Sequence, residues 1–92
     1  MDDIAELAEM FKTLSDPTRL KLVILLAENK GALCVNALAR NLGVTQSAVS
    51  QHLRILRQAG LVKGDRRGYH VHYSLNQDMI EQYRVKISET LV

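Results

Sequence analysis

The sequence contains few cysteine, proline or aromatic residues, and these shortages limit the kinds of protein that it can encode. Its 92 residues include one cysteine, one proline, one phenylalanine and no tryptophan. A single cysteine cannot form a disulfide within the chain, which agrees with a reducing, cytoplasmic environment. Because aromatic residues are scarce, we expect a hydrophobic core built from aliphatic side chains.

Long apolar runs and catalytic motifs are also missing. No apolar run approaches the roughly 20 residues that span a bilayer, so we expect no membrane segment. The chain starts with MDDI, which is acidic where a secretory signal would be basic. We find no phosphate-binding loop, no nucleophile–histidine pairing and no carboxylate pair suited to a cleft. We therefore expect neither an enzyme nor a bound cofactor or metal.

The length of the chain and the distribution of its charge indicate a single domain with one basic segment. A chain this short buries only about 60–70% of its unfolded surface, so we expect residues 1–92 to form a single domain. The net charge is +2, and residues 45–73 carry five Lys or Arg against one Asp. Such a concentration of positive charge suits a polyanionic partner, and it is equally the composition of a solvated face.

Hydrophobic periodicity predicts two helices in the first third of the chain. Asp16 and Pro17 form a typical helix start, as the N-cap and the first helical residue. The helix over residues 17–28 is apolar nearly all round, so we expect it to be buried on most sides. We expect the sequence Asn29-Lys30-Gly31 to end it, with a left-handed glycine. The preceding helix is marked by an apolar stripe at helical spacing: Ile4, Leu7, Ala8, Phe11 and Leu14.

Two shorter helices follow and are separated by a turn that contains Gly43. Thr45 is a good N-cap for the second of them, which we expect to run to about Ala59 and to stop at Gly60. A pair of helices joined in this way predicts a helix-turn-helix unit. The first helix of the pair is lined by apolar residues: Val35, Leu38, Ala39 and Leu42.

After Gly60 the hydrophobic period changes from 3.6 to 2, which predicts strands. We expect one strand at Leu61–Lys63, a second at Tyr69–Leu75 and a basic turn at Gly64–Gly68 between them. Asn76 should cap a final helix. The predicted fold is α+β and mainly helical, a winged helix-turn-helix in the order α-α-α-α-β-β-α, in which the β-hairpin is the wing.

The helix that begins at Thr45 has two chemically different faces. One face is apolar and should pack on the helix over residues 17–28. The other carries amide, hydroxyl and guanidinium groups, which bind base edges and phosphates. We expect it to read the major groove of double-stranded DNA, although these groups also occur on any solvated helix face. The polar edge, as we call it, consists of Thr45, Gln46, Ser47, Ser50, Gln51 and Arg54.

The wing adds positive charge beside this helix. We expect Lys63, Arg66, Arg67 and His70 to contact phosphates or the minor groove. His70 and His72 could instead form a metal pair, but two ligands do not close a zinc site and no third lies nearby. His52, on the packed side of the helix, is interpreted as a hydrogen-bonded structural residue.

Three ordered runs carry a family resemblance. They read LSDPTRL at 14–20, LGVTQSAVSQHLRILRQAGLV at 42–62 and GYHVHYSL at 68–75. In this order they resemble the ArsR-type (arsenic-repressor-like) winged-helix regulators. The resemblance implies a homodimeric repressor that leaves an inverted-repeat operator when an effector binds. It also implies a dimer interface formed by the first and last helices, for which the sequence offers Ile4, Leu7, Phe11, Ile80, Tyr83 and Ile87.

The sequence departs from the family at its usual metal ligands. Where many relatives have Cys-x-Cys, this chain reads Cys34-Val35-Asn36, and Asp78 is followed two positions later by Ile80 rather than His. We therefore expect no metal site of the known types, and the effector stays unidentified. Cys34 falls near a helix N-terminus, where a thiol can become reactive, so it is either a redox thiol or an inert apolar residue.

A second function class is open to this fold. A winged helix can serve as a protein-interaction module that binds no operator. Such a module would expose apolar residues on the Thr45 helix, whereas the polar edge there is rich in Gln and Ser. We therefore favour DNA binding.

Overall fold

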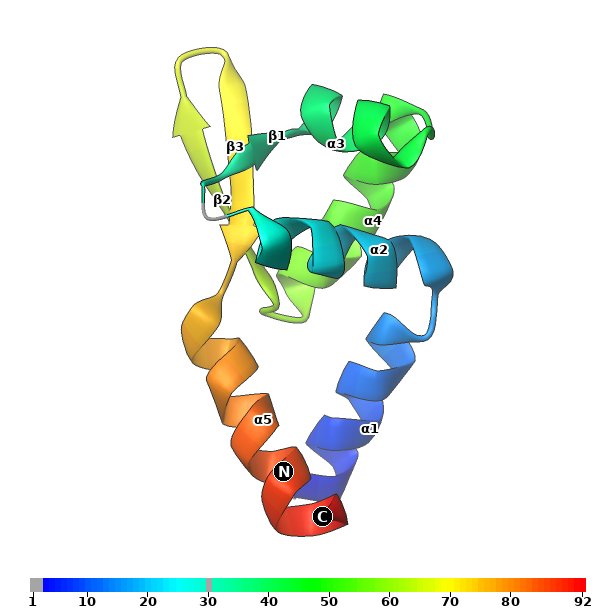
Figure 1. Ribbon diagram of the computed structural model, residues 1–92, viewed down its shortest axis with the longest axis vertical. Helices are drawn as coiled ribbons and strands as arrows, with labels where there is room; N and C mark the ends of the chain where they lie inside the picture. Colours follow the sequence, from blue (N-terminus) through cyan, green and yellow to red (C-terminus); the bar gives the residue numbers. More distant parts are fainter. Residues whose placement is uncertain (1–2, 30) are drawn as a thin grey trace.

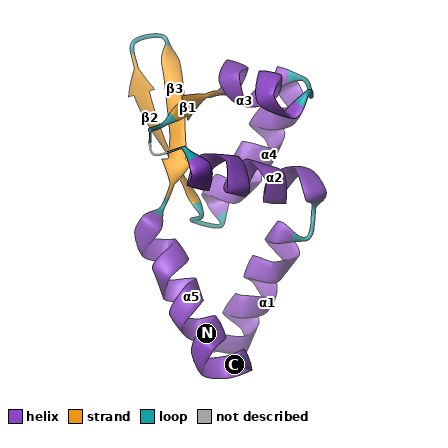
Figure 2. Ribbon diagram, in the orientation of Figure 1, coloured by secondary structure: helices purple, strands orange, loops and turns teal. Residues whose placement is uncertain are grey.

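The computed structural model describes residues 3–29 and 31–92. Met1, Asp2 and Lys30, which contribute to the acidic start and to the predicted helix end, lie outside the described residues. Figure 1 shows the first and last helices extending from a body made of the remaining elements and converging at their far ends, and Figure 2 shows that all strands lie in that body. The elements within the described residues are α1 (Asp3–Leu14), α2 (Pro17–Glu28), β1 (Leu33–Cys34), α3 (Val35–Leu42), α4 (Gln46–Gln58), β2 (Val62–Arg67), β3 (His70–Leu75) and α5 (Gln77–Leu91).

The predicted helix starts are confirmed by their caps. Asp16 Oδ1 accepts hydrogen bonds from the backbone N–H groups of Thr18 and Arg19 at 2.9 and 3.1 Å, and Pro17 follows as the first helical residue. Thr45 Oγ1 accepts from the N–H of Ala48 at 3.1 Å and so starts α4. These local bonds satisfy donors that a helix start leaves free.

The end of α2 differs from the prediction. Asn29 caps this helix in an extended conformation, and its N–H donates to Leu25 O. Gly31 does not have a positive φ, so the expected left-handed glycine is wrong. The glycine turn between α3 and α4 is confirmed, because Gly43 has a φ of +67°.

The sheet is larger than the sequence predicted. Its strands are antiparallel in the order β1-β3-β2, and the two-residue strand β1 was not anticipated. β2 extends to Arg67, which pairs with His70, so the predicted turn at Gly64–Gly68 is wrong. The turn consists of Gly68 and Tyr69 alone. Gly68 supplies a φ of +64°, and such a conformation suits a two-residue hairpin turn.

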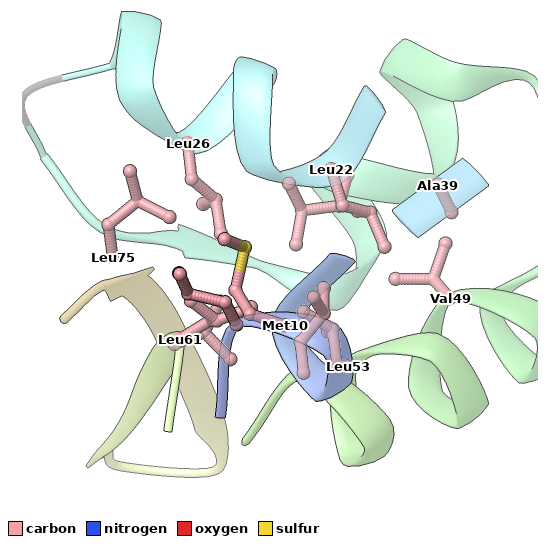
Figure 3. Packing of buried hydrophobic residues seen from close by; sticks show 12 residues of the cluster. Met10, Leu22, Leu26, Ala39, Val49, Leu53, Leu61 and Leu75 are labelled. Atoms are coloured by element: carbon pink, nitrogen blue, oxygen red, sulfur yellow. The ribbon is translucent and has the colours of Figure 1, made fainter. Parts of the chain in front are cut away.

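The core is aliphatic, as expected. Leu22 of α2, Leu38 of α3 and Leu53 of α4 are almost completely buried, and Met10 brings α1 into the same cluster (Figure 3). The expectation that α2 is buried on most sides is wrong, because its Leu20 and Ile24 are 43% and 49% exposed. A run of apolar residues does not reveal how many neighbours surround the helix.

Helices α1 and α5 lean together at their far ends (Figure 1). There Lys86 of α5 contacts Glu6 of α1, and Asp3 lies 3.8 Å from the same ammonium group. Nearer the body, a cavity of about 320 Å³ separates the two helices. The lining residues that α1 contributes are Glu6, Glu9, Met10 and Thr13.

Candidate nucleic-acid interface

The polar edge of α4 is exposed along its whole length. Thr45, Gln46, Ser47, Ser50, Gln51 and Arg54 are all solvent-exposed. On the opposite side Val49, Leu53 and Leu56 are at most 1% exposed and belong to the core cluster. Because the apolar side is locked into the core, the polar side is held at a fixed orientation on the surface.

Two shallow hollows flank the exposed side of α4. One is lined by residues of α3 and by the start of α4, including Asn36, Arg40 and Gln46. The other lies over Ser50, Gln51, Arg54 and Ile55. The sequence interpretation missed Arg40, since residues before 45 are negative in sum, although its position three residues before Gly43 was an available signal.

The wing cations are all exposed, but they do not share one face. Lys63, Arg66, Arg67 and His70 lie on the hairpin surface. Arg67 pairs with His70 across the strands and Arg66 with Val71, so the two arginines point to opposite faces, because successive side chains alternate. Arg67 Nε also lies 3.3 Å from Asp65 Oδ2, so part of its charge is balanced within the wing.

His52 is held on the inner side of α4, as interpreted. Its Nδ1 lies 3.5 Å from Arg19 Nη1 and 3.9 Å from Asp16 Oδ1. The backbone N–H of Arg19 is the main cause that lowers the pKa of the Asp16 carboxyl, and the N–H of Thr18 and the charges of His52 and Arg19 act in the same direction. Partial burial of the carboxyl opposes them.

Cys34 occupies the N-cap position of α3 without a side-chain hydrogen bond. It is partly buried and pairs with His72 across β1 and β3. His72 Nδ1 is buried and has no hydrogen-bond partner among the described atoms. Within residues 3–29 and 31–92, no three His, Cys, Asp or Glu are grouped to hold a metal ion. The redox thiol and the inert apolar residue both stay hypotheses for Cys34.

The apolar residues expected at a dimer interface lie in two different environments. Ile4 and Phe11 are 73% and 45% exposed on α1. Leu7, in contrast, is only 4% exposed and belongs to the protomer's own core, so it offers little surface to a partner. The α5 residues Ile80, Tyr83 and Ile87 are half-buried against the core cluster. No helix in the described part of the chain is long and apolar enough to span a membrane.

Comparison with known proteins agrees with this arrangement. Residues 16–63 match the model of the arsR family of bacterial regulatory proteins. A transcriptional repressor SmtB homolog from Synechocystis sp. is 41% identical over 99% of this chain and 67% of its own length. The arsenical resistance operon repressor of Escherichia coli is 44% identical over 74% of this chain and 57% of its own length.

Solved structures show the same fold. An ArsR-like transcriptional regulator from Rhodococcus superposes with a TM-score of 0.80 at 28% identity, covering 94% of this chain and 79% of that one. A homodimeric winged helix-turn-helix DNA-binding domain from Mycobacterium bovis superposes with a TM-score of 0.75 at 28% identity, covering 89% of this chain and 75% of that one. The predicted α+β winged helix-turn-helix fold is thereby confirmed.

Proposed function

This chain belongs to the arsR family of bacterial regulatory proteins, which are transcription regulators rather than enzymes, and from that premise we propose that it represses transcription as a homodimer on an inverted-repeat DNA operator. The observation that carries this proposal is the polar edge of α4. Its amides, hydroxyls and guanidinium are exposed, while the other side of the same helix is anchored in the core.

The polar edge and the wing have separate roles in this proposal. Gln46 and Gln51 would bond to adenine edges, and Arg54 would bind guanine or phosphate, because their donors and acceptors match those groups in the major groove. Arg66 and Arg67 would hold the flanking backbone or enter the minor groove, one from each face of the wing. Thr45, Ser47, Ser50, Lys63 and His70 would contribute further backbone or base contacts.

The exposed apolar residues of α1 support the dimer. Ile4 and Phe11 leave large apolar surfaces in water, and an interface with a second copy would cover them. With the neighbouring α5 residues Ile80, Tyr83 and Ile87, they would form a two-fold symmetric contact. Such symmetry places two α4 helices in successive major grooves and requires an inverted repeat. The effector that would release the DNA is unidentified, and the site of action would be the cytoplasm.

Recovery of genomic fragments on the purified protein, followed by gel shifts, tests the proposal. The double variant Arg66→Ala/Arg67→Ala should weaken binding to all sequences and lower the log–log salt slope by about two. Gln46→Ala should reduce discrimination between the recovered site and random DNA. Lys21→Ala, which removes an exposed cation of α2, is the control and should leave both the salt slope and the discrimination unchanged.

The outcomes are distinct. Equal loss on specific and random DNA for Gln46→Ala would contradict its assigned role in reading bases. If the unaltered protein retains no fragment at moderate salt, operator binding is wrong and the protein-interaction module replaces it.

A further inference from the structure

Three helices meet at the side chain of Arg19, in the first turn of α2. Its Nε donates a hydrogen bond of 2.6 Å to the carbonyl oxygen of Thr13, in the last turn of α1. Its Nη1 lies 3.5 Å from Nδ1 of His52, in the middle of α4. One guanidinium group therefore joins the end of α1 to the inner side of the helix that carries the polar edge.

The backbone around Arg19 is also held in place. Asp16 Oδ1 accepts from the backbone N–H of Arg19 at 3.1 Å, and the same oxygen lies 3.9 Å from His52 Nδ1. Thr13, Asp16, Arg19 and His52 are all partly buried, so water screens these contacts less than it would on the open surface. The guanidinium is planar and presents its donors in a rigid fork, so the contacts with Thr13 and His52 are oriented together.

Arginine is only a donor, so a hydrogen bond between Nη1 and His52 needs the tautomer in which Nδ1 carries no proton and accepts. The Thr13 carbonyl is one of the groups that the end of α1 leaves without a helical partner. A cation at that end is favoured by the helix dipole as well.

We propose that Arg19 is a positioning residue that sets the angle between α1 and α4, and through it the spacing of the two DNA half-sites. The inference rests on the proposed function, in which α1 contributes to the dimer interface and α4 reads DNA. In a two-fold dimer, the path from interface to reading helix determines the distance between half-sites. Apolar packing is non-directional, whereas the hydrogen bonds of Arg19 depend on direction.

Half-site spacing gives a readout that simple destabilisation does not change. The operator is first selected from random duplex DNA with the unaltered protein. Affinities are then compared for that duplex, for duplexes with the spacing changed by one or two base pairs, and for a single half-site. Arg19→Ala should reduce the preference for the native spacing by about fivefold or more, with half-site affinity unchanged within about twofold. Lys21→Ala, an exposed cation of the same helix, should keep the native preference.

The His52 side of the contact provides an independent variant. His52→Ala should also reduce the spacing preference, and the double variant should lose no more than Arg19→Ala alone, because Arg19→Ala already removes the contact with His52. His52→Asn, which keeps an acceptor near the position of Nδ1, should restore part of the preference. If Arg19→Ala does not fold, as judged by circular dichroism, the two His52 variants decide the matter.

Three outcomes are separable. An unchanged spacing preference in folded Arg19→Ala and His52→Ala overturns the inference and leaves the proposed function intact. A uniform loss at every spacing and on the half-site, with a salt slope lower by about one, makes Arg19 a phosphate contact instead and also overturns it. Failure of the unaltered protein to select any DNA overturns the proposed function itself.

Discussion

At the scale of single residues, Asp16 links local structure to pH. Its carboxylate accepts the N–H groups of Thr18 and Arg19 and so caps α2. The N–H of Arg19 is the main cause of the lowered pKa of this carboxyl. A carboxyl with a lower pKa in the folded state stabilises the fold above its unfolded pKa, and this contribution is lost as pH falls through the folded value.

Replacing Asp16 should therefore change the acid limb of the stability profile. Asp16→Asn keeps a capping oxygen but cannot ionise, so it should be less stable than the unaltered protein at pH 7. The difference should shrink below about pH 4 and vanish in stronger acid. Urea unfolding across a pH series measures both the stability difference at pH 7 and its disappearance in acid. Asp16→Ala, which loses the cap as well, should be the least stable at every pH, and a constant gap between Asp16→Asn and the unaltered protein would contradict the assignment.

At the scale of elements, α4 has one side buried in the core and the opposite side exposed to solvent. Leu56 is completely buried, whereas its neighbour Ile55 is 38% exposed beside the polar edge. We expect Leu56→Ala to lower the free energy of unfolding by about 2–5 kcal/mol, because it leaves a cavity in the core. Ile55→Ala is the matched control and should cost less than about 1 kcal/mol in the same denaturant titration. Similar losses would mean that α4 packs differently.

The turn between α3 and α4 depends on a left-handed glycine. Gly43 has a φ of +67°, which side chains rarely adopt. Gly43→Ala should destabilise the protein by about 1–2 kcal/mol, although no neighbour would touch the added methyl group. Gly31 also has open space around it but no positive φ, so Gly31→Ala should stay within about 0.5 kcal/mol of the unaltered protein. Thermal unfolding compares the two, and an equal cost would exclude backbone strain as the cause.

At the scale of the whole molecule, α1 presents apolar surface in two directions. Leu7 and Met10 point into the protomer's own core, while Ile4 and Phe11 remain exposed. The C-terminal end of α1 is followed by Asp16 and Arg19, and Arg19 contacts His52 of α4. A dimer interface on α1 would therefore be connected to α4 through Arg19.

A charge on the exposed surface of α1 should weaken the proposed dimer. Phe11→Glu would place a carboxylate in an apolar contact, and we expect it to weaken dimerisation by about tenfold or more. Sedimentation equilibrium measures the mass directly. Tyr69→Glu, at the 97% exposed wing turn, is the control and should leave the mass unchanged. A dimeric Phe11→Glu variant with unaltered affinity would place the interface elsewhere.

The sequence alone determined the features that depend on near neighbours in the chain. Caps at Asp16 and Thr45, the glycine turn at Gly43 and the two-faced period of α4 are local, so their chemistry predicts them. The order of the three sequence runs then indicated the family, because a match of motifs requires only the sequence. The polar edge was predicted correctly as exposed surface, since a 3.6-residue period sorts a helix into its faces.

Only the tertiary structure decided the features that depend on distant neighbours. It paired Arg67 with His70 and so shortened the wing turn, and it left Leu20 and Ile24 of α2 exposed. It also brought Arg19 against both Thr13 and His52, two residues that lie 6 and 33 positions away. Strand register, burial and such contacts arise when separate elements pack together, and hydrophobic periodicity reports only the face of each element by itself.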